Sequence, residues 1–464
     1  MSAVKFTLSS DDQDGVPCPD SIPLTVDEIT KSIVGHLKTQ CSKILSGCWS
    51  DTNNFCVELS KSCGLSNYLY IGYLNNDIIP MDNEPRKVLI RVYGEVLRSC
   101  TDSIISDSVN FALLSEKKIG PKLHGVFPGG RIEEYIESRP LTTQELPLII
   151  EVAARHMASF HKLSMPFSKT PSFIIRMFDK YLSQLTSTPE HLHRPSPNFS
   201  SNTLSELQSK GFSFANDGHI LTEPSYEEAR NMVYELSLIE EYNWIKEKFE
   251  VHYAEVFPIV FCHNDFQENN LLLLNDPEVE KFYRILPIDF EYSGYNYRAF
   301  DIGNHFNEWC YDYTNPNRPN YFHNIENYPD RSKQRLFWKA YLIEANSVVE
   351  NDHFNKRNGN FNCVDNYDNT TTTTTTTTTN NNNNNNNNDQ NVVRFSNHLH
   401  NEEYDDEILW IETIYGSLLS HLFWSAWSLV QSQLSSIQFD FMDYAKVRMQ
   451  HYHLMKSWLP REHL

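Results

Sequence analysis

A short polar turn wedged between two apolar segments is the feature that most restricts how this chain folds. The stretch FCHNDFQENNLLLLN, residues 261–275, places His263, Asp265, Gln267 and Asn270 directly ahead of an unbroken leucine run. An apolar run of this length, bounded by polar residues, predicts a buried strand. The chain must therefore fold so that a polar turn leads into the start of a strand.

The spacing of the polar residues in this turn matches a known catalytic pattern. His263, Asp265 and Asn270 read H-x-D-x-x-x-x-N, the catalytic loop of eukaryotic-type kinases. Phosphoryl transfer explains the spacing, because a carboxylate must lie beside the attacking hydroxyl while an amide past the turn ligates a magnesium ion. Taken alone, these residues fit an ordinary solvated turn equally well.

A second motif favours the catalytic interpretation. The segment RILPIDFEY is an apolar strand that ends in the tripeptide DFE, and its Asp289 follows Asn270 by 19 residues. Kinases place their second metal-binding aspartate at a similar distance, in the tripeptide DFG. Two motifs in the kinase order indicate a phosphoryl-transfer site.

Upstream of these motifs, a kinase needs a loop over the phosphates and a basic residue on a strand. The runs NYLYIGYL (67–74) and KVLIRVYG (87–94) are rich in β-branched and aromatic residues and predict a hairpin. The segment GLSNYLY (64–70) fits a phosphate loop or a plain turn, since it lacks G-x-G-x-x-G. Arg91 fits a phosphate contact in the cleft or the exposed face of the hairpin.

The remaining patterns predict an α+β fold with two lobes. A helix followed by a return strand is expected over 107–125, and segments with a 3.6-residue period dominate after residue 141. We expect a disordered arm at 1–24, a small β-rich N-terminal lobe at 25–136 and a larger, mostly helical lobe at 137–464. The runs of Thr and Asn within 351–405 predict a disordered insert in the second lobe.

Composition excludes several classes of protein. The formal net charge of -21 argues against binding to nucleic acid or to anionic lipid. The opening residues lack the apolar run of a secretory signal, and no stretch is long and apolar enough for a membrane-spanning helix. Nine cysteines without a paired spacing indicate reduced thiols, so we expect a cytoplasmic protein without a disulfide framework.

Longer segments of the chain resemble one family. The stretches FCHNDFQENN, PIDFEYSGYNYRAFDIGNHFNEW and FWSAWSLVQSQLSSIQFDFMDYA are similar to the choline/ethanolamine kinase family, and so are GLSNYLY, RKVLIRVYG and GPKLHGVF nearer the N-terminus. The resemblance runs from about Cys41 to Tyr452. It implies a protein-kinase-like fold and transfer of the γ-phosphoryl group of ATP, with Mg²⁺, to choline or ethanolamine in phospholipid head-group synthesis.

The resemblance also assigns roles to individual residues of the phosphoryl-transfer site. It implies Asp265 as the catalytic base, with Gln267 and Arg91 as supporting catalytic groups. The implied metal-binding residues are Asn270, Asp289 and Glu291. The implied nucleotide contacts are Gly64, Ser66, Asn67 and Arg91 around the phosphates and Glu134, Tyr135 and Ile136 at the adenine.

For the amine, the resemblance implies a pocket made of Glu308, Tyr313, Trp424, Trp427, Phe439 and Tyr444. A quaternary ammonium donates no hydrogen bond, so it needs aromatic faces and a nearby carboxylate. Without the resemblance, these aromatic residues would more simply be packing residues. Their number favours choline over ethanolamine as the acceptor.

The sequence departs from the family pattern at Asn269, where glycine is common; asparagine tolerates a left-handed backbone, so we expect the loop to survive. Several alternatives stay open: an ethanolamine kinase, a kinase of another small alcohol or of an aminoglycoside, and a non-catalytic scaffold with a kinase-like fold. Members of the family are often dimers, which allows a homodimer here.

Overall fold

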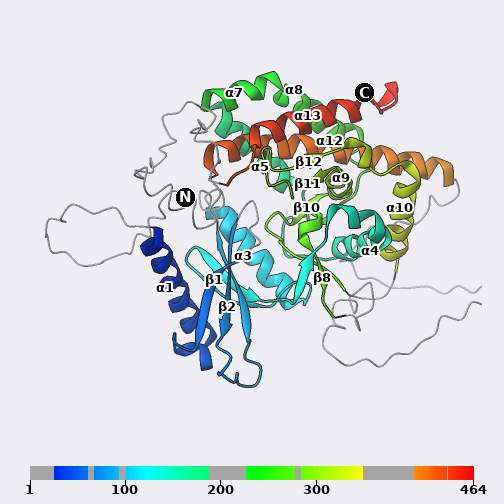
Figure 1. Cartoon of the computed structure of the whole chain (residues 1–464). Helices are drawn as coiled ribbons and strands as arrows, with labels where there is room; N and C mark the ends of the chain where they lie inside the picture. The colour runs from blue at the N-terminus through cyan, green and yellow to red at the C-terminus, as the bar shows by residue number, and fades with distance from the viewer. Residues whose placement is uncertain are drawn as a thin grey trace, which may run out of the picture.

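The chain folds into two lobes, one rich in strands and one mostly helical (Figure 1). The computed structural model describes residues 26–60, 67–93, 101–187, 226–276, 284–347, 402–435 and 437–464. The expected arm at 1–24 lies outside these residues, as do Gly64 and Ser66. The expected insert at 351–405 also lies outside them, except that helix α12 already begins at Glu402.

A five-stranded antiparallel sheet forms the first lobe, in the order β1-β2-β3-β5-β4. Its strands are β1 (Phe55–Leu59), β2 (Asn67–Leu74), β3 (Lys87–Tyr93), β4 (Leu123–Phe127) and β5 (Gly130–Glu134). The predicted hairpin is confirmed as β2 and β3, and the predicted helix and return strand are confirmed as α3 (Thr101–Glu116) and β4.

Alternating burial along these strands gives the lobe its own core. Trp49, Phe55, Leu74, Val88 and Ile90 are all buried between the sheet and helix α1 (Val26–Leu45). The register of β3 places Arg91 opposite Leu69 of β2 on one side and opposite Arg131 of β5 on the other. The strand register therefore carries a cationic side chain into the middle of the sheet, next to the second lobe.

Two small sheets of the second lobe carry the predicted catalytic motifs. β6 (Ser138–Pro140), β8 (Leu271–Leu274) and β9 (Ile285–Pro287) form one antiparallel sheet, and β7 (Ile259–Cys262) pairs with β10 (Gly294–Tyr297) in the other. The polar turn joins β7 to β8, and the DFE tripeptide joins β9 to β10. The leucine run is confirmed as strand β8, which follows the polar turn, and both motifs start where a short strand ends.

Helices surround these sheets in the second lobe. They are α4 (Ile150–His161), α5 (Ser172–Thr186), α7 (Tyr226–Glu235), α8 (Leu238–Glu247), α9 (Arg298–Glu308), α10 (Arg331–Ala345), α12 (Glu402–Leu434) and α13 (Phe441–Lys456). Shorter elements are the helical turns η1 (Gly47–Ser50), η2 (Thr143–Ile149), η4 (Lys248–His252), η5 (Glu268–Asn270), η6 (Ile325–Asn327) and η7 (Arg461–His463) and the strand pair β11 (Tyr311–Asp312) and β12 (Phe322–His323).

Helix α12 forms the centre of the second lobe, and Figure 1 shows it running alongside α13. Every residue from Ile411 to Ser432 is buried, which is typical of a helix surrounded by other elements. Its closest crossing is with α9, where a Cβ on Gly416 would lie 1.7 Å from the Ala299 carbonyl oxygen and one on Gly303 would lie 2.2 Å from the Ser417 nitrogen. The two glycines thus set how closely these helices approach.

The fold class is confirmed by this architecture: a small antiparallel β-sheet lobe precedes a mostly helical lobe. Among the helices within the described ranges, none combines the length and the apolar character needed to cross a membrane.

Candidate active site

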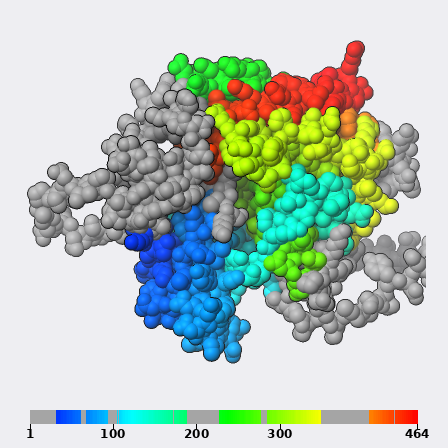
Figure 2. Space-filling view, viewed as in Figure 1, coloured from blue at the N-terminus to red at the C-terminus, as the bar shows by residue number. Residues whose placement is uncertain are grey.

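One cavity of about 410 Å³ lies between the lobes. In the space-filling view the first lobe, in blue, lies below residues from the later part of the chain (Figure 2). The cavity joins most of the residues that the sequence singled out. Those lining it are Asn67, Arg91, Glu134, Tyr135, Ile136, Asp265, Gln267, Asn270, Asp289, Glu291, Glu308, Tyr313, Trp424, Trp427 and Tyr444.

The turn between β7 and β8 is held by a buried aspartate on α9. Asp301 accepts the backbone N–H of His263 at 2.8 Å through Oδ2 and the N–H of Asn264 at 2.9 Å through Oδ1. Asn264 takes a positive φ of 65°, a conformation that asparagine tolerates well. The turn is therefore fixed in position before any ligand binds.

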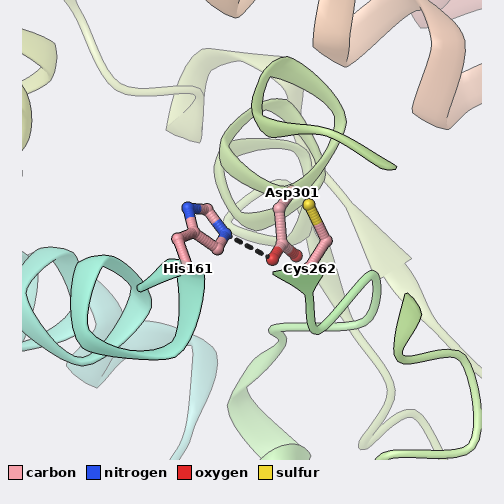
Figure 3. Close-up of side chains that lie close together, drawn as sticks. All are labelled: His161, Cys262 and Asp301. Carbon is pink, nitrogen blue, oxygen red and sulfur yellow. Dashed lines mark hydrogen bonds and ion pairs between the residues drawn. The ribbon is translucent and has the colours of Figure 1, made fainter. Parts of the chain in front are cut away.

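Figure 3 shows how Asp301 is itself oriented. The His161 Nε2–H donates to Asp301 Oδ2 at 2.9 Å, and the Tyr341 hydroxyl lies 2.8 Å from His161 Nδ1. Burial alone would raise the pKa of Asp301, but the hydrogen bond and charge of His161, together with the His263 amide, lower it.

Cys262 lies beside this pair, and its Sγ, His161 and Asp301 offer three ligand atoms within 4.8 Å of one another. A metal ion is a poor fit there. The Asp301 oxygens already accept the two amides and His161, while the Cys262 thiol lies 3.6 Å and 3.7 Å from the carbonyl oxygens of Asn296 and Tyr297. This buried group supports the polar turn and offers no open site.

His263 shapes the polar turn from within. Its Nε2–H donates to the Ile288 carbonyl at 2.9 Å, and its Nδ1 accepts the backbone N–H of Asp265 at 3.3 Å. Burial lowers the pKa of His263, so the ring is neutral and its tautomer is set by these two bonds. His263 links the turn to the segment before the DFE tripeptide and has no proton free for exchange.

Asp265 extends from this turn into the cavity. The Asn270 amide donates to Asp265 Oδ2 at 2.7 Å and to the Asp265 carbonyl at 2.9 Å. Burial, followed by the charges of Glu308 and Asp289, raises the pKa of Asp265 well above its ordinary value. The structure thus holds a carboxylate of enhanced basicity at the position that the motif predicted.

The DFE tripeptide faces Asp265 from the other side of the cavity. Asp289 has a positive φ of 65°, which costs a residue with a side chain about 1 kcal/mol or more and is commonly found at functional sites. Its carboxylate accepts Arg91 Nη1 at 3.2 and 3.3 Å. Glu291 accepts the Asn67 amide at 3.0 Å, and burial together with the charge of Asp289 raises the pKa of Glu291.

Arg91 is part of a buried network of charges in the first lobe. Its Nε donates at 2.9 Å to Glu133 Oε1, which also accepts Arg131 Nε at 2.7 Å. Arg131 in turn pairs with Asp107 on α3. Glu133 thereby links β3 to β5 and fixes the Arg91 guanidinium toward Asp289, while Arg131 links β5 to α3. The sequence allowed Arg91 to lie either in the cleft or on the exposed face of the hairpin. In the structure it lies in the cleft.

The end of β5 lines the cavity at its other side. Glu134, Tyr135 and Ile136 border it where the chain passes from the first sheet to β6. Lys87 lies over the Tyr135 ring with its Nζ 4.9 Å from the ring centroid.

The predicted amine pocket is drawn from three separate segments. Trp424 and Trp427 lie on α12 with ring centroids 5.3 Å apart at an interplanar angle of 82°. The Trp424 Nε1–H donates to Asn304 Oδ1 at 2.7 Å, which fixes that ring. Glu308 ends α9, and Tyr313 reaches it with a hydroxyl bond of 2.7 Å to Oε2.

Two sequence expectations need qualification. Phe439 packs behind Tyr313 and Tyr444, at centroid distances of 6.3 and 5.3 Å, and is not among the residues that line the cavity. Gln267 lines the cavity, but its Oε1 also caps the turn by accepting the Asn269 amides at 3.1 Å.

One expectation about the backbone is wrong. Asn269 needs no left-handed conformation, because it lies in the helical turn η5 and the positive φ falls on Asn264 instead. The tight part of the turn is at His263 and Asn264, whose backbone N–H groups both donate to the Asp301 carboxylate, and not at Asn269.

The sequence analysis missed Arg448, which also lines the cavity. It lies on α13 and pairs with Glu308. Asp301 and Glu133 were missed as well. Arg448 and Tyr444 are four residues apart on one helix face, a spacing that offered a signal.

Comparison with known proteins identifies the family. A family model described as choline/ethanolamine kinase matches residues 60–453. The chain belongs to the choline/ethanolamine kinase family. It is 34% identical to the choline/ethanolamine kinase of Rattus norvegicus over 466 residues, which covers 98% of this chain and 95% of the relative. It is 33% identical to choline kinase alpha of Mus musculus, over 89% of this chain and 78% of the relative.

Among solved structures, the choline kinase of Cryptosporidium parvum superposes on this chain with a TM-score of 0.55 and 24% identity, covering 92% of this chain and 96% of the other. At that identity the similarity supports the fold alone. Family membership confirms the predicted enzyme class, a phosphotransferase of the choline/ethanolamine kinase family, and it supports the use of ATP.

Proposed function

We propose that this chain transfers the γ-phosphoryl group of ATP to the hydroxyl of choline, which forms phosphocholine for phosphatidylcholine synthesis. One observation carries the proposal: a single cavity joins Asp265 and Asp289 to a wall of aromatic rings. The carboxylates suit phosphoryl transfer, and the rings suit a methylated cation.

Asp265 is the proposed general base. A hydroxyl bound in front of it would give its proton to a carboxylate whose raised pKa makes it a stronger acceptor than an ordinary aspartate. Asn270 holds that carboxylate in place through the hydrogen bond from its amide nitrogen. The attacking oxygen is thereby oriented toward the phosphates.

Magnesium fits the residues beside Asp265. The Asn270 side chain uses its amide nitrogen to bond Asp265 and would offer its Oδ1 to the metal. Asp289 and Glu291 add carboxylates, the oxygen ligands that Mg²⁺ prefers. Burial, and then the negative charge of Asp289, raise the pKa of Glu291, and a divalent cation would offset that negative charge. Bound there, Mg²⁺ would neutralise charge on the transferring phosphate.

The first lobe supplies the proposed nucleotide contacts. Arg91 is buried, charged and aimed at Asp289, so it is placed to meet phosphate oxygens at the metal. Asn67 lies beside it, and Gly64 and Ser66 precede Asn67 in the chain. Glu134, Tyr135 and Ile136 are the proposed border of the adenine.

Ethanolamine is the second candidate acceptor. Its ammonium needs hydrogen-bond acceptors, and Glu308 and Asp265 place two carboxyl groups on the same cavity. The chain is also 28% identical to a probable ethanolamine kinase B of Dictyostelium discoideum. We propose choline as the better substrate because aromatic rings outnumber carboxylates in this part of the cavity.

An assay of ADP release tests the proposal directly. The purified full chain would be supplied with ATP and Mg²⁺ and with choline, ethanolamine, an unrelated small alcohol or an aminoglycoside. We expect Mg²⁺-dependent ADP release with choline, weaker release with ethanolamine, and none above background with the others. ADP release that does not depend on either amine would reject the proposed function.

A further inference from the structure

Four side chains at the amine end of the cavity form a closed ring of hydrogen bonds. Arg448 contacts both the Tyr444 hydroxyl, through Nε at 2.9 Å, and Glu308 Oε1. The Tyr444 and Tyr313 hydroxyls lie 2.8 Å apart, and Tyr313 reaches Glu308 Oε2 at 2.7 Å. Arg448, Tyr444, Tyr313 and Glu308 thus close a ring, in which Arg448 and Glu308 are the two charged members.

The direction of every bond in this ring is determined. A guanidinium only donates and a carboxylate only accepts, so Tyr444 must accept from Arg448 and Tyr313 must donate to Glu308. The remaining proton, that of Tyr444, then donates to Tyr313. Both hydroxyl protons are consumed inside the ring, and each Glu308 oxygen has accepted one.

Burial makes the ring costly to open. Relative exposure is 0% for Arg448 and 3% for both Glu308 and Tyr444. The Arg448 guanidinium also lies 4.1 Å from the Tyr311 ring centroid and 4.9 Å from that of Tyr444. Removing one partner of a buried ion pair strongly destabilises the protein, because the other charge is left buried without compensation.

We propose that Arg448 is the positioning residue that sets amine specificity: by holding Glu308 in this ring, it leaves the pocket with aromatic faces and few free acceptors, so that the site selects a fully methylated ammonium. This rests on the proposed function of the same cavity. It assigns selectivity to a residue that acts on the amine through its hold on Glu308 and Tyr444.

The physical reason lies in what the two amines require. A trimethylammonium has no N–H, so it needs only the negative faces of Trp424, Trp427 and Tyr444 and a diffuse negative field. A primary ammonium brings three N–H donors, and each one left without an acceptor costs free energy on leaving water. Arg448 and Tyr313 already occupy one acceptor site on each Glu308 oxygen, so Glu308 has fewer sites left for a primary ammonium than a free carboxylate has.

The test is a series of amines that differ by one methyl group at a time. Ethanolamine, N-methylethanolamine, N,N-dimethylethanolamine and choline would be compared by kcat/KM and, in the same proteins, by Kd from calorimetry. We expect wild type to improve with each methyl group. In Arg448→Leu the choline-to-ethanolamine ratio should fall about tenfold, because a freed Glu308 serves a primary ammonium best. Arg448→Lys, which keeps the charge but not the forked geometry, should restore part of the ratio.

Two further variants keep the test decisive if Arg448→Leu does not fold. Tyr313→Phe retains the ring face but frees Glu308 Oε2, so it should lower the same ratio. Tyr321→Phe is the matched control, since it removes a buried tyrosine hydroxyl that bonds Asp443 outside the ring, and its ratio should equal that of wild type.

A wild-type series that is flat, or a folded Arg448→Leu and Tyr313→Phe with unchanged ratios, would overturn the inference. The Kd values separate this from the proposed function. An absence of turnover with both amines rejects the kinase proposal, while the trend in Kd with methylation still decides the role of Arg448.

Discussion

Asp265 is a carboxylate whose surroundings resist its ionisation. It shares the cavity with Asp289, Glu291 and Glu308, and burial together with the charges of these neighbours raises its pKa. A base that is poorly stabilised in its charged form takes a proton more readily, which is the property that removal of a hydroxyl proton requires.

We therefore expect Asp265→Asn to lower kcat by about 10²- to 10⁴-fold, since an amide cannot take the acceptor's proton. The affinity for ATP should change by no more than a few-fold, because Asp265 acts on the amine's hydroxyl. Steady-state kinetics and nucleotide calorimetry measure the two effects. Asp82→Asn, at an exposed position in a loop of the first lobe, is the control and should match wild type. Near-normal turnover in Asp265→Asn would contradict the assignment.

Residues were predictable where the chemistry lies in one short stretch. Asp265, Asn270 and Asp289 could be proposed from the order and spacing of two motifs, because a single turn and a single strand end carry them. Arg448 and Asp301 were not, because their role depends on partners that only folding brings near. Arg448 acts on Glu308, 140 residues away, and Asp301 acts on His263, 38 residues away.

Among the helices, α9 and α12 carry residues of the proposed amine pocket. α9 ends in Glu308 and α12 carries both tryptophans, so the distance between these helices sets the width of the pocket. Their crossing has no room for a side chain at Gly416 or Gly303. Sequence periodicity predicted helices in this part of the chain. It did not predict that a glycine would set their separation, because the apolar pattern does not show where two backbones come into contact.

Gly416→Ala should destabilise the protein by about 1–3 kcal/mol, because its new methyl group would meet the Ala299 backbone and force the helices apart. We also expect KM for choline to rise as the tryptophans move relative to Glu308. Urea unfolding and amine kinetics measure these effects. The matched control is Gly35→Ala in α1, where a Cβ meets nothing within 4 Å; it should be neutral or stabilising by up to about 1 kcal/mol. Equal effects of the two substitutions would contradict this account of the crossing.

At the scale of the whole molecule, buried histidines link stability to pH. Burial, and then the charges of Arg448 and His451, lower the pKa of His421 well below its ordinary value. Neither His421 ring nitrogen has a hydrogen-bond partner among the residues that the structure describes. The unfolded chain protonates this histidine near pH 6.5, whereas the folded protein resists protonation, so His421 lowers stability as pH falls below about 6.5.

Buried carboxyls such as Glu268, whose pKa is raised by burial, act in the opposite direction, so the comparison must be made between variants. Relative to wild type, His421→Leu should gain roughly 1 kcal/mol for each pH unit below about 6.5, because only wild type loses this contribution. Unfolding in urea at pH 7, 6 and 5 measures the difference. A constant difference across this range would show that His421 does not titrate between the two states.

The two-lobe architecture and the order of its motifs were predictable, because they follow from local patterns along the chain. The boundaries at 24, 136 and 351–405, and the homodimer that the family allows, stay predictions. The charged network of Arg91, Glu133, Arg131 and Asp107 was not predictable, since alternation along a strand says which residues are buried but not which buried charges will pair.

The predicted insert can be tested from the helices on either side of it. Arg331 and Arg335 of α10 pair with Glu407 and Asp406 at the start of α12, at 2.7 and 2.6 Å. The start of α12 is thus held near the N-terminal end of α10, while the chain leaves α10 at Ala345. Since α10 has 15 residues, any connection must span roughly 20 Å back along it.

Replacing residues 351–401 by about 12 Gly and Ser residues should therefore preserve activity and stability, since a flexible linker of that length has an average span close to the required distance. The control is a linker of about three residues that replaces residues 346–401, directly between Ala345 and Glu402. It falls short of that distance even when extended, so it should pull apart the ion pairs between α10 and α12 and lower the Tm. Specific activity and thermal unfolding of both deletions measure these outcomes. A large loss of soluble yield or specific activity with the longer linker would show that the low-complexity tract itself contributes to the working protein.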